Sequence, residues 1–255
     1  MLRTTKEMLG YTVKGFDDTI GKVDDFFFFD DDFHIRYLVV QIGAFVFNRK
    51  VLITPDALGE PDWVSQQFPV NLTKKEIKGS PDIKTNRPIS AMDLERLHDY
   101  YRWPKFWSPL NPAVSPPKGM KNDQHSSSTN TVRLSIQKQK QITEPKLRSM
   151  KEIIGYRVKA SDGMAGTVID TILNDQTWKF HYVVINTGTI FNHKKVLLAV
   201  DWINLFQHRK SQIQVDMPVR TIEDSPEFDP NTPMTHRREE VYYDFHGKPY
   251  YWVKR

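Results

Sequence analysis

The sequence repeats itself once, and this internal repeat limits the folds that the chain can adopt. Residues 6–25 read KEMLGYTVKGFDDTIGKVDD, and residues 151–170 read KEIIGYRVKASDGMAGTVID. The two stretches are related by a constant shift of 145, which holds from Lys6 to Trp107 without an insertion or a deletion. A tandem duplication of this length predicts two structural units of one fold, joined by a connecting segment.

The most regular part of each copy is predicted to be a β-hairpin. Residues 35–53 read IRYLVVQIGAFVFNRKVLI, and residues 180–198 read FHYVVINTGTIFNHKKVLL. β-Branched and aromatic residues on both sides of a polar corner are typical of paired strands. Residues 11–25 predict a further strand, turn and strand, and another strand is expected around Phe68 and Val70. The sequence therefore predicts a mainly β fold.

Each copy ends in a segment that we expect to be partly helical. Ser90, with Asp93 three residues later, resembles a capping box, and Leu94 and Leu97 then follow at helical spacing. A Trp-Pro pair ends the helix, because the residue before proline avoids the α-helical region. The corresponding segment of the second copy, residues 235–251, carries weaker helical signals.

The connecting segment, residues 108–145, is rich in Pro, Ser, Gln and Lys and has few periodic hydrophobic residues. Such a composition does not bury enough apolar surface to order a chain, so we expect a flexible linker. The predicted organisation is a first module at residues 1–107, the linker, and a second module at residues 146–255.

Composition excludes several classes of protein. A hydrophobic content of 39% and a charged content of 26% are typical of a globular domain. Because the chain has no cysteine, disulfides, thiolate catalysis and cysteine-ligated metals are excluded. The sequence offers neither a run of about 18 apolar residues nor a secretory signal, so we expect no membrane span and a cytoplasmic location.

The basic character of the chain, with a pI of about 9.2, raises the question of nucleic-acid binding. Residues 1–107 carry 15 Lys and Arg against 16 Asp and Glu, so the excess of positive charge lies in the linker and the second copy. A nucleic-acid surface usually concentrates basic side chains on folded structure. Nucleic acid is therefore a less favoured partner than another protein.

Several short motifs recur in both copies at the predicted strands. They are Gly10-Tyr11-x-Val13, the Asp17–Gly21 turn, Gly21-Lys22-Val23-x-Asp25 and Tyr37-Leu38-Val39-Val40, with Gly155-Tyr156-x-Val158, Asp162-Gly163, Gly166-x-Val168-x-Asp170 and Tyr182-Val183-Val184-Ile185 in the second copy. On these motifs, each copy resembles the PRC-barrel family. That family includes the cytoplasmic domain of the photosynthetic reaction centre H subunit and stand-alone bacterial proteins, whose aromatic tail the YYRWPKFW of residues 100–107 also resembles.

The resemblance implies a mainly β chain of two tandem, small, bent antiparallel β-barrels, each followed by a short helix and an aromatic tail. It also implies binding or assembly rather than catalysis. We expect no counterpart of the membrane anchor of the photosynthetic subunit, and a shared fold alone does not establish a function.

The duplication provides a filter for catalytic chemistry, because a site present in both modules should keep its residues at positions 145 apart. No histidine is shared in this way. Among the acidic pairs that the copies share, six have two interpretations, as a carboxylate site for a cation or as residues that stabilise turns. These pairs are Asp17/Asp162, Asp25/Asp170, Asp30/Asp175, Asp56/Asp201, Glu95/Glu240 and Asp99/Asp244. We favour the second interpretation and expect no catalytic residue, no cofactor and no metal.

Aromatic residues are the strongest candidates for an interaction surface, since Trp and Tyr dominate binding hot spots. The candidates lie in the run of four phenylalanines at residues 26–29 and in the two tails: Phe27, Phe29, Trp103, Phe106, Trp107, Tyr250, Tyr251 and Trp252. The alternative is that each tail folds back over its own module. An alternating strand directs Phe27 and Phe29 to the face opposite Phe26 and Phe28, so the outward pair needs a cover. We expect the helix and tail of the same copy to provide it.

These observations predict a non-enzymatic interaction or assembly protein, including one that acts at a membrane or electron-transfer complex. The two modules could pack together or stay independent. The alternative is an RNA- or ribosome-associated assembly factor. A small metal-dependent hydrolase is the third and least favoured reading.

The composition of the linker generates the first testable prediction. Limited proteolysis should cut first within residues 108–145 and produce two compact fragments of similar size, because unstructured chain is the preferred substrate of proteases. Gel electrophoresis and mass spectrometry identify the sites. Early cleavage within residues 35–53 or 180–198 contradicts the two-module organisation.

Overall fold

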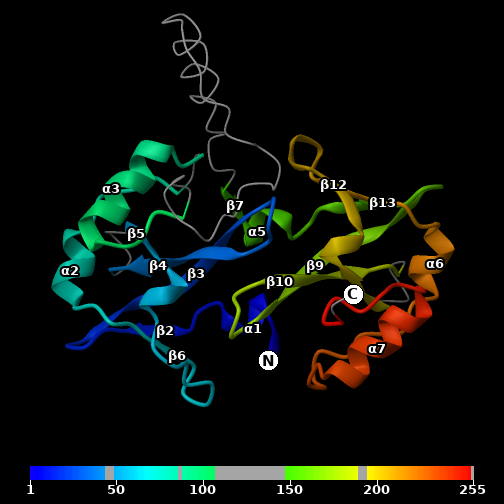
Figure 1. Ribbon diagram of the computed structural model, residues 1–255, viewed down its shortest axis with the longest axis horizontal. Coiled ribbons are helices and arrows are strands. Elements are labelled where there is room, and N and C mark those ends of the chain that lie inside the picture. The colour runs from blue at the N-terminus through cyan, green and yellow to red at the C-terminus, as the bar shows by residue number, and fades with distance from the viewer. Residues whose placement is uncertain (44–48, 86–87, 107–146, 189–193, 254–255) are drawn as a thin grey trace, which may run out of the picture.

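The structure is a computed structural model that describes residues 1–43, 49–85, 88–106, 147–188 and 194–253. Strands dominate these residues and form two mixed sheets with helices on their outer sides (Figure 1). The prediction of a mainly β fold is confirmed at this level. Within the described residues, the strand order of each sheet is open and does not close into a ring. The residues described include no helix long and apolar enough to cross a membrane.

The first sheet has the order β5-β4-β3-β2-β6. Its strands are β2 (Thr12–Lys14), β3 (Thr19–Phe29), β4 (Ile35–Ile42), β5 (Arg49–Ile53) and β6 (Gln67–Pro69). A 3₁₀ helix, η1 (Pro55–Ala57), follows β5, and two α-helices, α2 (Lys74–Gly79) and α3 (Ala91–Tyr101), follow β6. The predicted hairpin is confirmed as β4 paired antiparallel with β5, although residues 44–48 at its corner lie outside the described part.

The second sheet repeats this order as β11-β10-β9-β8-β13 and adds β12 at its edge. Its strands are β8 (Arg157–Lys159), β9 (Met164–Asn174), β10 (Phe180–Asn186), β11 (Lys195–Ala199), β12 (Ile203–Gln207) and β13 (Gln212–Val215). The helices are η2 (Val200–Trp202), η3 (His208–Lys210), α6 (Val219–Glu223) and α7 (His236–Phe245). The weakly predicted second helix thus forms as α7.

One expectation about strand direction is wrong. We expected antiparallel sheets, but β6 runs parallel to β2, and β13 runs parallel to β8. Parallel neighbours need a long connection. Here strands β3 to β5 connect β2 to β6, and strands β9 to β12 connect β8 to β13. Hairpin signals reveal antiparallel neighbours only, so this pairing has no short-range signature.

The two copies exchange their first residues. Strand β1 (Leu2–Thr4) pairs with β9 of the second sheet, and β7 (Leu147–Ser149) pairs with β3 of the first sheet. Each strand continues into a four-residue helix, α1 (Thr5–Met8) or α5 (Met150–Ile153). We call residues 2–8 the first arm and residues 147–153 the second arm. Each arm therefore completes the sheet of the other copy, a reciprocal exchange within one chain.

The copies also meet at equivalent positions. The backbone N–H of Ile35 donates to the carbonyl of Trp178 at 2.8 Å, and the N–H of Phe180 donates to the carbonyl of Phe33 at 2.7 Å. Because Phe180 and Trp178 are the equivalents of Ile35 and Phe33, this reciprocal pair relates the two halves by an approximate two-fold axis. Phe33 and Trp178 share a left-handed backbone, with φ of 58° and 54°.

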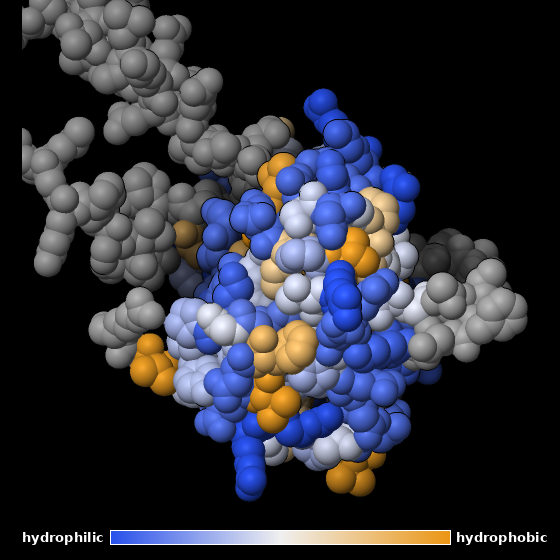
Figure 2. Space-filling model, turned by 90° about the vertical axis from the view of Figure 1, so that its right-hand side faces the viewer, coloured by the Kyte–Doolittle hydropathy of each residue, from blue (hydrophilic) through white to orange (hydrophobic). Residues whose placement is uncertain are grey.

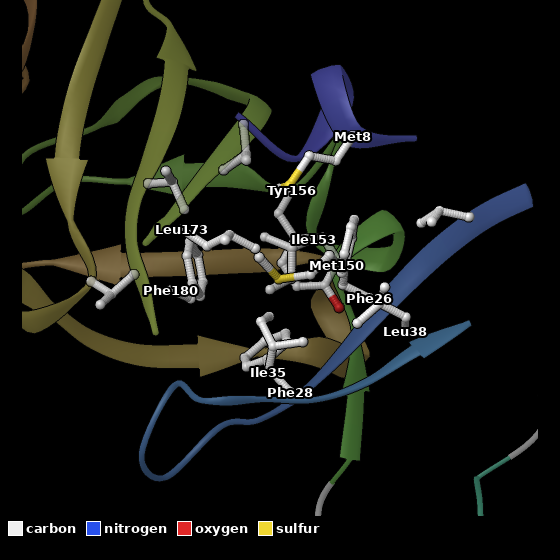
Figure 3. Close-up of a cluster of buried hydrophobic side chains, with 14 of the residues drawn as sticks. Met8, Phe26, Phe28, Ile35, Leu38, Met150, Ile153, Tyr156, Leu173 and Phe180 are labelled. Atoms are coloured by element: carbon white, nitrogen blue, oxygen red, sulfur yellow. The ribbon is translucent and has the colours of Figure 1, made fainter. Parts of the chain in front are cut away.

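A single apolar core lies between the two sheets. The inward faces of both sheets and both arms contribute to it, and Figure 3 shows Met8, Met150 and Ile153 of the arms among residues of both sheets. The rings of Phe28 and Phe180 meet edge to face, 5.5 Å apart. Two smaller clusters lie on the outer sides, one beneath α3 and one beneath α7. The result is a layered order of helix, sheet, shared core, sheet and helix (Figure 1).

The four phenylalanines of β3 divide between these layers as the alternation predicts. Phe26 and Phe28 lie in the shared core, whereas Phe27 packs beneath α3 with Leu94 and Leu97. The ring of Phe29 contacts that of Phe106 in the tail, 5.3 Å away. The expectation that the first module's own helix and tail cover the outward pair is therefore confirmed.

Exchange of the arms changes what linker cleavage should do. After a cut within residues 108–145, each fragment still holds an arm in the sheet of the other, and the shared core remains buried. The two fragments should elute together in size-exclusion chromatography under native conditions and separate in concentrated urea. Separate elution of the fragments under native conditions contradicts the exchange.

Candidate functional site

The shared acidic residues are the first candidates for a site, and two of them lie beneath the exchanged arms. Asp25 accepts hydrogen bonds from the backbone N–H of Lys151, at 3.1 Å, and from the Ser149 hydroxyl, where the second arm begins its helix. Asp170 accepts a bond from the N–H of Lys6, at 3.2 Å, in the first arm. The first N–H groups of a helix have no partner within that helix. Each carboxylate therefore caps a helix that belongs to the other copy.

The next shared pair fixes the strands of the arms. Asp30 lies 3.3 Å from the guanidinium of Arg148 in the second arm, and Asp175 lies 2.9 Å from that of Arg3 in the first arm. The pKa of Asp30 is lowered: burial acts to raise it, but hydrogen bonds and charge from His208 and Arg148 outweigh burial. These contacts connect the two copies in the same way on both sides of the two-fold axis.

The surroundings of the two arginines differ. The guanidinium of Arg3 lies 3.6 Å from the ring centre of Trp63, a cation–π contact. His208 occupies the position equivalent to Trp63, and its Nε2 lies 3.4 Å from Asp30. Arg3 of the first arm therefore lies against an indole ring, whereas the second arm lies beside an imidazole ring that also contacts its Glu152, at 3.8 Å.

Two more shared pairs have local structural roles. Asp17 accepts the backbone N–H of Lys74 at 2.8 Å, and Asp162 accepts that of Val219 at 2.7 Å, so each contacts the start of the helix that follows the sheet. In the final helices, Asp99 pairs with Lys105 at 2.8 Å, and Asp244 accepts the Tyr250 hydroxyl at 2.6 Å. Glu95 and Glu240 lie one turn earlier on the same helices.

Asp56 and Asp201 are different. Both carboxylates are exposed, lie in the 3₁₀ helices η1 and η2, and make no hydrogen bond or ion pair with the part of the chain that the structure describes. Each lines a pocket beside its 3₁₀ helix and the tail of its own copy, with volumes of about 280 Å³ in the first half and about 470 Å³ in the second. Residues 176–178 of the second half also line the first pocket, whereas the second pocket is lined by its own half. The pockets share equivalent lining positions: Asp56/Asp201, His98/Tyr243, Trp103/Lys248, Pro104/Pro249 and Phe106/Tyr251.

The aromatic residues proposed as an interaction surface lie at or beneath these tails. Phe27 and Phe29 are only 7% and 8% exposed, so their place in an accessible surface was predicted wrongly: the tail and α3 cover them. The other described candidates are half-buried and pack against their own halves: Trp103, Phe106, Tyr250, Tyr251 and Trp252. Trp107 lies outside the described residues. The tails therefore fold back, and their exposed edges form the pocket walls.

Buried polar groups fix the tails in place. In the first half, the Tyr37 hydroxyl lies 2.6 Å from Nε2 of His98, whose Nδ1 lies 2.9 Å from the carbonyl of Pro104. In the second half, Glu239 accepts the hydroxyls of Tyr182 and Tyr251 at 2.6 and 3.0 Å.

These groups connect sheet, helix and tail. Glu239 is 2% exposed, and burial raises its pKa. The tyrosine hydroxyls that bond to it offset its burial, which is the usual requirement for a buried acid. Sequence reasoning missed Glu239 because its equivalent is Leu94, so the duplication filter removed it.

The remaining histidines of the described ranges lie in separate parts of the fold. His34 and His181 lie near the meeting of the halves, His208 near the second arm, and His236 and His246 on and beyond α7. Within the described ranges, no group of three or more His, Asp or Glu side chains is placed to hold a metal ion.

Comparison with known proteins adds no relative. No protein-family model matches the sequence, and no curated protein matches it significantly.

The buried carboxylate of Asp25 generates a prediction about stability. Asn at this position keeps an oxygen for the Lys151 N–H and an amide that donates to Ser149, so Asp25→Asn should stay within about 1 kcal/mol of the wild type at neutral pH. Asp25→Ala removes the acceptor and should lower the free energy of unfolding by about 1–3 kcal/mol. Urea denaturation measures both; equal stability of all three proteins contradicts the capping role.

The same variants predict a pH dependence of known sign. Burial raises the pKa of Asp25 above 3.8, so the folded state holds the proton more strongly than the unfolded state. Wild-type stability from this group is then lost as the pH rises through the raised pKa, and Asp25→Asn should become relatively more stable with rising pH.

Asp24 is the matched control for this pH dependence. Burial acts to raise its pKa, but hydrogen bonds from Lys151 and Lys50 outweigh burial and lower it. Wild-type stability from this group is lost as the pH falls, so Asp24→Asn should become relatively less stable as the pH rises through that lower window. The same sign for both variants contradicts the assignment.

Proposed function

We propose that the protein is a non-enzymatic, cytoplasmic binding or assembly module, built from two PRC-barrel-like halves that act as one rigid body. The observation that carries this proposal is the use made of the shared residues. Asp25, Asp30 and their equivalents hold the exchanged arms, and Asp17 and its equivalent hold the helix behind each sheet. The acidic residues that both copies share thus stabilise the contact between the halves and the helix behind each sheet.

The strand geometry is consistent with bent, barrel-like halves. Strand β3 is 11 residues long, pairs with β2 and β7 on one side and with β4 on the other, and shows register shifts at two points in its pairing with β4. Strand β9 has the same length and the same kinds of neighbours. Register shifts of this kind bend a strand and increase its twist, as a small barrel requires.

The outer surface is suited to selective contacts. The side that faces the viewer in Figure 2 is largely hydrophilic, with apolar side chains in small separate patches. Val241 and Phe245, one helical turn apart on α7, are 52% and 43% exposed. Small patches within a polar surface favour reversible contacts over permanent burial.

The proposal is tested by partner capture followed by reconstitution. The immobilised full chain is incubated with an extract of the native organism, and partners retained after nuclease treatment and in 0.5 M salt are identified by mass spectrometry. We expect at least one purified protein partner to rebind with defined stoichiometry in isothermal titration calorimetry.

Two results contradict the proposal. Capture that disappears with nuclease, or that weakens steeply with salt, points to phosphate contacts and supports the RNA-associated alternative. Catalytic turnover of a substrate by the purified chain alone contradicts the non-enzymatic assignment.

A further inference from the structure

The pockets beneath the two tails occupy equivalent places, but the two halves fill them differently. In the first half, the guanidinium of Arg36 lies 4.8 Å from the ring centre of Phe106 and 5.1 Å from that of Phe29. Its charge is balanced by an ion pair with Asp32. The first half thus places a cation of its own on the aromatic tail beside its pocket.

In the second half, the residue equivalent to Arg36 is His181, and the residue equivalent to Phe106 is Tyr251. The two rings lie 4.6 Å apart. Burial lowers the pKa of His181 to about 4, so this ring is neutral at neutral pH. Among the residues described, no Lys or Arg side chain lies over an aromatic ring of the second pocket. The aromatic surface persists there, but the built-in cation does not.

The walls of the second pocket suit a cation. Trp202, Tyr243, Tyr250 and Tyr251 line it, with the ring centres of Trp202 and Tyr243 5.0 Å apart and those of Tyr243 and Tyr250 6.0 Å apart. Both pairs meet at steep angles, 73° and 72°. Tyr243 is only 2% exposed, so the half-buried rings of Trp202, Tyr250 and Tyr251 form the accessible aromatic wall. Such an arrangement is the usual receptor for organic cations.

Asp201 supplies negative charge to the same pocket. Its carboxylate is exposed and has no partner within the described residues. Burial is the main cause that raises the pKa of Tyr243, and the charge of Asp201 adds to it, which places that charge within electrostatic reach of the aromatic wall. The exposed side chain of Lys248 lines the same pocket, and its positive charge opposes the effect of Asp201.

We propose that the pocket between η2 and the C-terminal tail binds an organic cation, an ammonium or guanidinium group, between its aromatic walls and Asp201. The pocket, of about 470 Å³, holds the head and stem of a lysine or arginine side chain. The inference deepens the proposed binding role and rests on it for its biological meaning. The inference identifies the ligand as a basic side chain of a protein partner. A free alkylammonium metabolite has the same chemistry and is the alternative source of the cation.

The test is a titration of the full chain at constant ionic strength, followed by tryptophan fluorescence and by the aromatic NMR signals of the tail. The probes are n-butylammonium, n-butylguanidinium and the neutral 1-butanol, with sodium chloride as the salt control. We expect saturable changes with both cations and a response at least about fivefold weaker with butanol. A second pair of probes, Nα-acetyl-lysine methylamide and a lysine-containing tetrapeptide, distinguishes the two sources of the cation. Tighter binding of the tetrapeptide indicates a protein side chain as the source, and equal binding indicates a free cation.

Three variants make the test specific. Asp201→Asn should weaken butylammonium binding by about three- to tenfold, and Lys248→Gln should tighten it by a similar factor, since each changes one charge beside the ligand. Asp56→Asn, the matched change in the first half, should leave binding unchanged. Because neither Asp201 nor Asp56 has a partner to lose, thermal unfolding of both variants should match that of the wild type.

Several outcomes overturn the proposal. They are the absence of saturation at about 100 mM cation, equal responses to butanol and butylammonium, and cation binding that Asp201→Asn and Lys248→Gln leave unchanged. A negative result here leaves partner capture intact, because a partner can bind elsewhere on the surface. Conversely, failure of partner capture does not remove a measured cation site, so the two proposals fail separately.

Discussion

The rest of the structure depends on the exchange of the two arms. Each arm contributes only three strand residues and one helical turn, but it brings fully buried apolar side chains with it: Met8 from the first arm, and Met150 and Ile153 from the second. Burial of one such side chain contributes about 1.5–3 kcal/mol. Short strands that would fray alone are therefore fixed by the core that they help to close. The first N–H groups of these two helices lack partners within the helix, and Asp25 and Asp170 accept their hydrogen bonds.

The exchange gives the chain the character of a dimer whose two subunits are covalently joined. Contacts near the two-fold axis remain equivalent, as the reciprocal bonds between residues 33–35 and 178–180 show. Away from the axis the halves have diverged. Arg3 stacks on Trp63 where the other half has His208, and Arg36 covers its aromatic tail where the other half has a neutral His181. Joining two copies in one chain permits such divergence, because each half can change without altering the other.

Much of the local structure could be predicted from the sequence, because its causes are local. Strand alternation assigned the faces of Phe26–Phe29, and the Ser90 capping signal located the start of α3. The parallel pairing of β6 and the exchange of the arms could not be predicted in this way, since both depend on contacts between distant segments. A signal for the arms was nevertheless present: Leu2-Arg3 is repeated as Leu147-Arg148, just before the region where the repeat was traced.

The candidate site shows the same division. The sequence favoured turn stabilisation for the shared acids. It could not separate those that hold the arms, such as Asp25 and Asp30, from Asp56 and Asp201, which line pockets. Glu239 and Arg36 differ between the copies and escaped the duplication filter for that reason. Residues that distinguish the halves are as informative here as those that the halves share.

Native-state hydrogen exchange tests the central claim, that two exchanged arms make the halves one cooperative body, most directly. The backbone amides of Lys6 and Lys151, which donate to Asp170 and Asp25, report on the arms. The account predicts that these amides open only with global unfolding, with the same free energy as the central strands β3 and β9. Exchange of both amides at the rate of a fraying terminus, while β3 and β9 remain protected, would contradict it.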